Sequence, residues 1–493
     1  MKRRQFVAAS ALLPLAAAHA HAQGTAAAAP EGEIAADKAQ RDLRLLQRAF
    51  TDLHPGLYRY ATAAQIDAEF AAAQEAVKGG ISRAGMVLLA SRLAAAVRCG
   101  HTWVSPYNQS PAVDELLARA DKLPLSLRFV EGRALVTGSA VPGVQAGAEL
   151  LAVDGRGITE IVDALLPLLR ADGEHAGARG KRLSQLDSGP NGGAMDRLFP
   201  LRFPPPAGGY RLRVRPAPGA VPQDFDAAAV ALAARDKLLP PPSTQWTFRV
   251  EGEVATLTLP TFAFWRSDFK PEVFLSRAFT AIRRVPYLVI DQRRNEGGDD
   301  AIGRLLLSHL LRAPAQFPGY RVESAYERAP YALARYLDTW DFGFFDRTGQ
   351  VTKGPGRNWL LPDRPGARIE PNPLNYPGKV VVLVGPQNSS AGFLLARALK
   401  VTGAATLVGQ PTGGNLRGLN GGQLAWITLP NSGVGVDIPL LASVYDGEPD
   451  SGVTPDVMVA PSFADAQAGA DTEMRAAFGV ISRWKDAAAP AKP

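Results

Sequence analysis

Two adjacent serines, Ser389 and Ser390, lie where an apolar run over 380–384 gives way to a helical pattern that begins near residue 391. A hydroxyl in such a strand-to-helix turn lies at a helix N-terminus, where the free N–H of Ala391 and the helix dipole favour a developing oxyanion. A serine is also a common helix cap, a role that involves no chemistry. The turn therefore predicts either a nucleophile or a cap.

A second polar turn, Asn295-Glu296-Gly297-Gly298, follows the apolar run over 287–291. Glycine lets the backbone approach a ligand closely, so this turn can offer bare N–H groups to a bound molecule. We expect Asp291 and Arg293 to be structural and to tie the end of the strand to its neighbours by hydrogen bonds. Both polar turns end predicted strands, and an α/β sheet binds its ligands at that edge.

One histidine lies at a position suited to a general base. His54 precedes proline in a turn, His175 lies in a polar loop, and His309 falls within a helical run of leucines. A lone histidine is more often a core residue than a catalyst, so its position must argue for a role. Only His101, after Gly100, lies at a switch from helix to strand, where an imidazole could project into a cleft.

The elements that must position these groups fall into three stretches. Residues 35–97 repeat apolar side chains at helical spacing, with breaks at His54-Pro55-Gly56 and Gly79-Gly80. Short strands and one helix over 123–215 predict a small separate module, which proline-rich segments near 203–206 and 239–242 bound. From 246 to 459, strands alternate with helices, which indicates an α/β layered domain.

Composition sets the class of protein. The chain has 493 residues, 46% apolar and 20% charged, which indicates a soluble globular protein of two or three domains. Its single cysteine excludes an intrachain disulfide and a cysteine-based zinc cluster. The net charge of +7 is scattered, without a basic run among aromatics, so we expect no nucleic-acid partner.

The N-terminus resembles an export signal. Arg3 and Arg4 precede an apolar run over 7–18 that is too short to span a bilayer, and Ala20-His21-Ala22 suits cleavage after Ala22. The Arg-Arg-x-Phe-Val pattern resembles a twin-arginine address, and an ordinary secretory signal is the alternative. No second apolar run of membrane-spanning length follows. We therefore expect a periplasmic or secreted protein with no membrane partner.

Four ordered motifs together resemble the tail-specific, or C-terminal processing, serine peptidases and the related tricorn core protease. Residues 290–298 (Ile-Asp-Gln-Arg-Arg-Asn-Glu-Gly-Gly) are similar to the family's Asp-Leu-Arg-x-Asn-x-Gly-Gly turn, and 390–393 (Ser-Ala-Gly-Phe) to its Ser-Ala-x-Glu nucleophile turn. Residues 407–414 resemble the strand and loop that follow, and 452–456 (Gly-Val-Thr-Pro-Asp) the closing motif. The pattern over 142–155 is similar to the core of the family's PDZ-like module.

The resemblance implies an α/β fold in which a ClpP/crotonase-like layered core carries a PDZ-like module and an N-terminal helical domain. In chain order, the expected parts are a signal peptide over 1–22, the helical domain over 31–108, the PDZ-like module over 109–218, the catalytic core over 240–461 and a C-terminal tail over 462–493.

The sequence departs from this family at its usual base. Tail-specific members use a Ser-Lys dyad, but Asn415 occupies the place of the lysine. The resemblance to the tricorn branch instead implies that His101 is the base for Ser390, with a nearby acid in support. Glu448 is the expected acid and Asp450 the alternative, and neither is in register with the family. Phe393 replaces the family's glutamate.

The implied function is an exported serine peptidase with polypeptide substrates and no cofactor or metal. Ser390 and His101 would carry out acyl transfer, and the N–H groups of Ala391 and of Gly297 or Gly298 would form the oxyanion hole. Two alternatives stay open at this point: a non-catalytic ligand- or peptide-binding protein on the same fold, and a non-peptide ester hydrolase. The sequence implies no particular oligomeric state.

Overall fold

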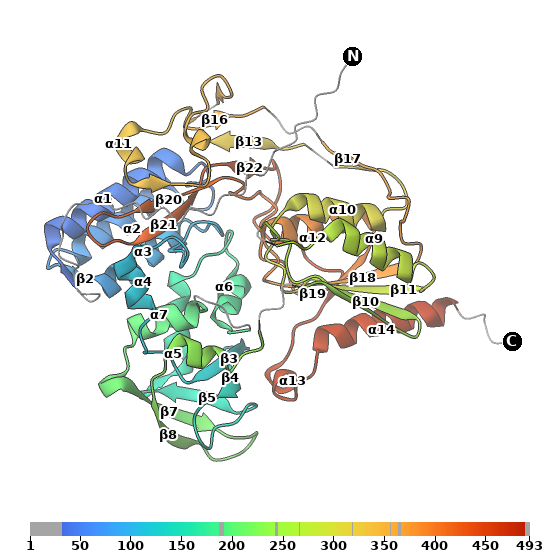
Figure 1. Ribbon diagram of the computed structural model, residues 1–493, viewed down its shortest axis with the longest axis horizontal. Coiled ribbons are helices and arrows are strands. Elements are labelled where there is room, and N and C mark those ends of the chain that lie inside the picture. The colour runs from blue at the N-terminus through green and yellow to red at the C-terminus, as the bar shows by residue number, and fades with distance from the viewer. Residues whose placement is uncertain are drawn as a thin grey trace.

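The computed structural model describes residues 32–186, 192–241, 245–265, 267–317, 319–354, 356–362 and 366–488. The predicted signal peptide, residues 1–22, lies outside these ranges. None of the helices within them combines the length and apolar character needed to cross a bilayer. Figure 1 shows a helical N-terminal part, a small module below it, and a layered α/β core beside both.

The N-terminal helices form where the apolar spacing predicts them. They are α1 (Ala36–Leu53), α2 (Ala63–Ala76), α3 (Arg83–Ala96) and the short α4 (Pro111–Leu117), and the small strands β1 (Glu33–Ile34) and β2 (Ile81–Ser82) pair beside them. The Thr62 hydroxyl accepts from Gln65 N at 3.2 Å, and the Gln65 side chain accepts from Thr62 N at 2.8 Å. This capping box satisfies N–H groups that would otherwise lack partners and so sets the start of α2.

A distant part of the chain completes the core of this helical part. The sheet β14-β20-β21 comprises Leu337–Asp338, Leu424–Thr428 and Gly435–Pro439. Its buried side chains, among them Ile427 and Ile438, share one hydrophobic cluster with Leu43 and Phe50 of α1. Figure 1 shows β20 and β21 beside α1 and α2. Residues from the predicted catalytic core and from the predicted helical domain are therefore packed together, which the alternation of elements along the chain does not show.

The small module is an antiparallel sheet covered by helices. Its strand order is β3-β4-β5-β7-β8, with β6 paired to β5. The strands are β3 (Leu125–Val130), β4 (Arg133–Ser139), β5 (Glu149–Val153), β6 (Arg156–Gly157), β7 (Gly209–Arg215) and β8 (Gln223–Ala228). The helices are α5 (Ile158–Leu165), η1 (Leu166–Leu168), α6 (Ala176–Leu183), α7 (Ala194–Arg202), η2 (Pro206–Gly208) and α8 (Leu232–Asp236). The expected short strands are confirmed, but the stretch over 123–215 contains helices α5, α6 and α7 where one helix is expected. The PDZ-like identity of the module stays a prediction.

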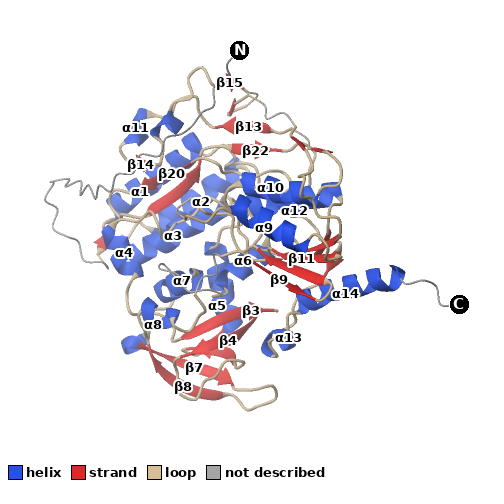
Figure 2. Ribbon diagram, turned by 45° about the vertical axis from the view of Figure 1, so that its right-hand side comes forward, coloured by secondary structure: helices blue, strands red, loops and turns tan. Residues whose placement is uncertain are grey.

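The α/β core is a sheet in the order β23-β19-β18-β11-β10-β9, parallel except for β9. Its strands are β9 (Thr247–Glu251), β10 (Val254–Thr258), β11 (Tyr287–Asp291), β18 (Lys379–Val384), β19 (Thr406–Gly409) and β23 (Val457–Met458). Helices α9 (Pro271–Ile282), α10 (Asp300–Leu310) and α12 (Ser390–Thr402) cover one face. Helix α14 (Thr472–Ala488) covers the other, as Figure 2 shows. Both faces are buried, which explains why β11 and β18 are nearly all apolar.

The remaining elements are short and connect these layers. The four-stranded sheet β15-β16-β13-β22 lies above the helical part in Figure 1, and β12 pairs with β17. Their bounds are β12 (Ala315–Gln316), β13 (Arg321–Ser324), β15 (Thr352–Lys353), β16 (Trp359–Leu360), β17 (Arg368–Ile369) and β22 (Ala442–Val444). The last helical elements are α11 (Tyr331–Ala334), η3 (Phe342–Phe345) and α13 (Phe463–Gln467).

Candidate active site

The two polar turns meet because their strands are neighbours. Strands β11 and β18 run parallel with Asp291 opposite Leu383, so both end at the same edge of the sheet. A Cβ on Gly297 would lie 2.9 Å from Ser390 Cβ and 2.8 Å from Ala391 N, distances that no side chain tolerates. The buried Asn388 side chain joins the turns, since it donates to Asn295 O at 3.1 Å and accepts from Gly385 N at 2.9 Å. Glycine at 297 therefore lets the second turn approach Ser390.

Ser390 has an unusual backbone for a serine. Its φ is +46°, in the left-handed region, which costs a residue with a side chain about 1–3 kcal/mol. Ser389 occupies the cap position of α12, but its side chain accepts no hydrogen bond from a helix N–H, and its hydroxyl donates to Glu296 O at 3.1 Å. A strained serine at a sharp strand-to-helix turn is the arrangement that exposes a nucleophilic hydroxyl in other hydrolases. Neither hydroxyl therefore caps α12.

Gly297 and Gly298, the glycines of the second turn, differ in whether the backbone N–H is available to bind a substrate. Gly297 and Gly298 both have positive φ, +117° and +138°, which only glycine adopts easily. Gly297 N donates to Asn295 Oδ1 at 2.9 Å, so it is engaged within the turn. The N–H of Gly298 is thus the better candidate of the two for binding a substrate oxygen.

His101 lies against a glycine and beside a buried carboxylate. A Cβ on Gly421 would be 3.4–3.6 Å from three atoms of the imidazole, so the ring lies close to that backbone. Asp172 Oδ1 accepts from Gly100 N at 2.7 Å. Among the described residues, His101 Nδ1 and Asp172 Oδ2 are both buried without a hydrogen-bond partner. These two side chains and Cys99 each place a ligand-type atom within 4.8 Å of the other two.

Asp172 is a residue that the sequence motifs do not reveal. It lies in an irregular loop of the small module, between η1 and α6, and no periodic pattern surrounds it. A Cβ on Gly100 would be 2.5 Å from Asp172 Oδ2, so Gly100 is required for the carboxylate to lie this close to the histidine segment. The Gly100-His101 pair is the only sequence signal for this contact. It indicates a close approach at Gly100 but does not identify Asp172 as the residue that makes it.

The surroundings of His101 keep its imidazole neutral. Burial lowers the pKa of His101, and Arg170 and Arg182 lower it as well. Asp172 and Glu296 act in the opposite direction and raise the pKa without outweighing burial. A neutral imidazole can accept a proton, as a general base must.

Glu296 connects the histidine side of the site to the serine side. Its carboxylate lies 3.4 Å from an Arg182 nitrogen and 3.6 Å from an Arg170 nitrogen, and it acts electrostatically on His101. Its backbone carbonyl accepts the Ser389 hydroxyl. His101 and the Ser390 turn therefore share Glu296 as a common neighbour.

The expected supporting acids have other partners. Glu448 forms an ion pair with Arg397 of α12 at 2.9 Å. Asp450 Oδ1 accepts from Asn415 Nδ2 at 2.7 Å, so the residue in the place of the family's lysine is held by an acid. The carboxylates that act on His101 are Asp172 and Glu296. The role predicted for Glu448 stays a prediction, and Asp172 is the stronger candidate for it.

The other residues considered from the sequence have structural contacts. His54 is buried and hydrogen-bonded to Thr102 at 2.9 Å, and burial lowers the pKa of His54 to about 3. His309 stacks on Phe279 with ring centroids 4.4 Å apart. His175 directly precedes α6 at its N-cap position and lies close to the closing motif, since a Cβ on Gly452 would be 3.0 Å from its ring.

The expected structural role of Asp291 and Arg293 is confirmed. The Arg293 guanidinium donates to both Asp291 oxygens, at 3.0 and 2.6 Å. Phe393, which replaces the family's glutamate, is fully buried and packs against Gly414.

The group Cys99, His101 and Asp172 has ligand types that suit a metal ion. A metal-binding cysteine must be a thiolate, however, and burial raises the pKa of Cys99, with Asp172 acting in the same direction. The protonated thiol that results is a poor ligand. The arrangement is better suited to moving a proton between an imidazole and its surroundings.

The comparisons with known proteins concern the family of the core and the fold of the chain. Residues 253–459 match the family model described as Peptidase family S41. Mature CPAF in complex with lactacystin shares the fold, with a TM-score of 0.61, 16% identity, and coverage of 88% of this chain and 95% of that chain. Mature CPAF alone gives a TM-score of 0.59 at 16% identity, covering 88% of this chain and 94% of that one. No curated protein matches the chain in sequence. Residues 253–459 are therefore a peptidase family S41 domain, and the chain is a serine-type peptidase.

Proposed function

We propose that this peptidase is exported and cleaves polypeptides through an acyl-enzyme formed on Ser390, with His101 as the general base. The observation that carries the proposal is the left-handed Ser390, which packs against the Gly297 turn at the ends of two parallel strands. The strain at that residue serves to aim a hydroxyl away from its own helix.

The reaction divides into two steps. In the first, His101 takes the Ser390 proton, the serine oxygen attacks the peptide carbonyl carbon, and the protonated imidazole then gives its proton to the leaving amine. In the second, His101 takes a proton from water, the resulting hydroxide attacks the acyl-enzyme, and Ser390 recovers its proton. The N–H groups of Ala391 and Gly298 hold the negative oxygen in both steps, with Gly297 N–H as the alternative donor to Gly298.

Asp172 completes this arrangement as a positioning residue. A carboxylate oxygen of Asp172 and a ring nitrogen of His101 lie within 4.8 Å of each other, and within the described part of the chain Asp172 Oδ2 and His101 Nδ1 are both unpaired. A small movement of either side chain would let Nδ1–H donate to the carboxylate and leave Nε2 to handle the serine proton. The carboxylate would also stabilise the imidazolium that forms during the reaction.

The small module supports capture of a polypeptide chain. Its sheet ends in strand β8 at one edge, and an extended peptide can add to such an edge through backbone hydrogen bonds. At the other edge, backbone groups of β3 already bond to Ser184 and Gln185. Export is supported by the N-terminal sequence, and N-terminal sequencing of the protein purified from its host should begin at Gln23. A mature chain that still begins at Met1 would contradict export by a cleaved signal.

The decisive experiment compares two neighbouring serines. Ser390→Ala should reduce hydrolysis of unfolded casein by about a thousandfold or more and should abolish labelling by a fluorophosphonate probe. Ser389→Ala, the matched control on the same turn, should keep the labelling. Circular dichroism checks that both variants fold. Turnover retained in Ser390→Ala would refute the assignment, and hydrolysis of aryl esters without hydrolysis of casein would favour the ester hydrolase.

A further inference from the structure

A cavity of about 280 Å³ lies where the three parts of the molecule meet. Trp103 lines it from the N-terminal part, Arg170 and Arg182 from the small module, and Glu296 and Gln387 from the core. Glu296 directly precedes Gly297, and Gln387 lies three residues before Ser390. The cavity therefore borders both turns of the candidate active site.

The charged side chains that line this cavity are mostly basic. Among the described residues, the lining contains four cations, Arg170, Lys181, Arg182 and Arg197, and one carboxylate, that of Glu296. Glu296 contacts Arg182 and Arg170 only loosely, at 3.4 and 3.6 Å. Asp172 and Asp437 also act on Arg170, but neither lines the cavity. The lining thus carries an excess of positive charge.

Holding these cations together is unfavourable without an anion. Burial and like-charge repulsion from Arg182 lower the pKa of Arg170 to about 10, although Glu296 acts in the opposite direction. Burial also lowers the pKa values of Lys181 and Arg197. The Nε atoms of Arg170 and Arg182 are buried and have no acceptor among the described residues. An anion in the cavity would relieve the repulsion and supply acceptors.

The arginines are held in position for a planar ligand. The Arg170 guanidinium lies 3.9 Å above the Trp103 ring and donates to Gly100 O, so its orientation is constrained from two sides. Arg197 donates to Gly192 O at 2.6 Å and also lies over Trp103, at 5.8 Å. A guanidinium in a fixed plane suits the two oxygens of a carboxylate.

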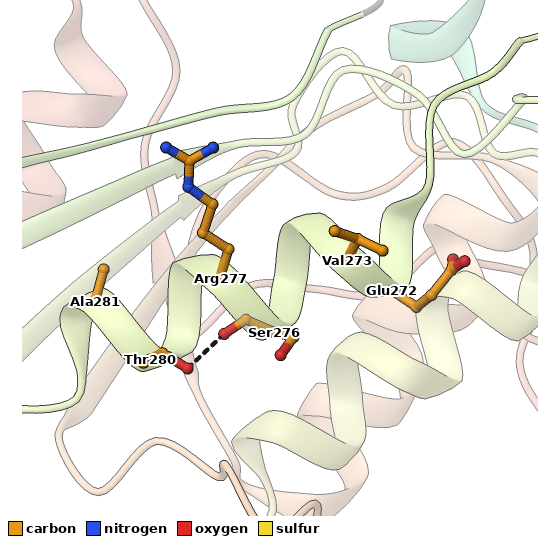
Figure 3. A pocket seen from close by; sticks show the side chains of 6 residues that line it. All are labelled: Glu272, Val273, Ser276, Arg277, Thr280 and Ala281. Carbon is orange, nitrogen blue, oxygen red and sulfur yellow. Dashed lines mark hydrogen bonds between the residues drawn. The ribbon is translucent and has the colours of Figure 1, made fainter.

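We propose that this cavity is a substrate subsite that binds a carboxylate group of the polypeptide, close to the bond that Ser390 would cleave. The inference rests on the proposed peptidase function and adds the substrate class. A polypeptide offers such a group at its C-terminus and on Asp or Glu side chains, and both would use the same cations. By contrast, the hollow in Figure 3 is lined by six side chains of α9 alone and has no convergent charges.

Binding of short peptides to the Ser390→Ala variant tests the subsite independently of turnover. The probes are an eight-residue peptide of Ala, Gln and Leu with a free C-terminal carboxylate, the same peptide with a C-terminal amide, and amide peptides in which one Glu occupies each position in turn. Isothermal titration calorimetry should show binding of a carboxylate peptide at least about tenfold tighter than that of the plain amide. Preference for the free end or for one Glu position identifies the source of the carboxylate.

Substitution of a lining cation then connects the preference to the cavity. Arg182→Gln should reduce the preference for the carboxylate peptide to about threefold or less, and Arg182→Lys should restore part of it because the charge is kept. Arg249→Gln, which removes an exposed arginine from β9, is the matched control and should leave the preference unchanged.

The outcomes separate this inference from the proposed function. Equal binding of acid and amide peptides, no binding of any carboxylate peptide, or a preference that survives both Arg182→Gln and Lys181→Gln would overturn the subsite. Hydrolysis of casein by the unaltered protein, lost in Ser390→Ala, tests the peptidase proposal on its own. If the protein hydrolyses casein but shows no preference for carboxylate peptides, only the subsite proposal is refuted.

Discussion

Arg293 and Glu296 lie three positions apart on one turn, but they differ in how closely side chains of opposite charge surround them. Arg293 faces three carboxylates at close range: Asp291 at 2.6 Å, Asp471 at 2.7 Å and Glu473 at 2.9 Å. Glu296 faces two guanidinium groups at 3.4 and 3.6 Å and borders a cavity. The ion pairs of the first cluster are short, and we call it the closed cluster. Those of the second are longer, and the second cluster borders a cavity.

The difference separates a structural network from a functional one. Although burial works against it, hydrogen bonds to Asp291 and Asp471 raise the pKa of Arg293, so that cluster is stabilised in its charged form. It joins the end of β11 to the start of α14 and leaves no N–H donor of Arg293 free for a ligand. Around Glu296, Arg170 and Arg182 retain unused donors beside His101. We therefore expect changes in the first cluster to alter stability and changes in the second to alter catalysis.

The largest effect is expected from removing the centre of the closed cluster. Arg293→Gln leaves three neighbouring carboxylates without their cation, and breaking a partly buried pair in this way costs about 3–5 kcal/mol in the free energy of unfolding. Urea denaturation measures the loss. Arg304→Gln removes an exposed arginine that pairs with Asp300 on α10 and should cost under about 0.5 kcal/mol. Equal stability of the two variants would contradict the structural role of the Arg293 cluster.

Asp172→Asn should leave stability nearly unchanged and lower kcat by about a hundredfold or more. The amide oxygen of asparagine still accepts from Gly100 N, but the charge that orients and stabilises His101 is lost. Steady-state kinetics on casein-derived peptides should show an unchanged KM, and fluorophosphonate labelling should slow in parallel. Glu174→Gln, which removes a neighbouring exposed acid paired with Arg98, is the control. A full rate in Asp172→Asn would remove this residue from the mechanism.

Glu296→Gln should shift the pH dependence of the reaction. His101 must be neutral to act, so the rate falls as the pH drops through its pKa. The Glu296 carboxylate raises the pKa of His101, and its removal therefore lowers that pKa. The acid limb of kcat/KM should move to lower pH, which a pH–rate profile measures. A limb that stays in place or moves to higher pH contradicts the placement of Glu296 beside the base.

Asp471→Asn should give the smallest effect, under about 1 kcal/mol, because Asp471 is partly exposed and solvent screens its pair with Arg293. Although burial raises it, the hydrogen bond from Arg293 holds the pKa of Asp471 below its usual value. A depressed folded-state pKa means that the stabilisation is present above the unfolded-state pKa of about 4 and is lost as the pH falls below it. Unfolding at pH 7 and in acid should show the difference between parent and variant only at pH 7.

The elements of the core could be predicted because their signals are local. The apolar run over 287–291 matches β11 residue for residue, and the short strands expected within 123–215 include β3 and β5. The breaks at His54-Pro55-Gly56 and Gly79-Gly80 separate α1, α2 and α3. The polar turns are recognisable in the same way, since glycine marks the places where backbone must approach backbone. Gly297 against Ser390 and Gly100 against Asp172 are both such places.

Contacts between distant segments could not be predicted. Strands β20 and β21 pack on α1, nearly four hundred residues earlier in the chain, as the hydrogen bond that Asn431 Nδ2 donates to Asp42 at 2.7 Å illustrates. The position of Asp172 beside His101 and the basic cavity could not be predicted for the same reason. Both bring together side chains from separate parts of the molecule. No period or spacing within one segment encodes such a meeting.

The sequence by itself determined the signal-like N-terminus, the layered order of elements, and the candidate nucleophile and base, Ser390 and His101, because each depends on the types of residues within a few positions. Only the tertiary structure decided that Ser390 adopts a left-handed backbone, that Asp172 rather than Glu448 lies beside His101, and that four cations surround one cavity. These features depend on which surfaces pack together, and packing is a property of the whole chain.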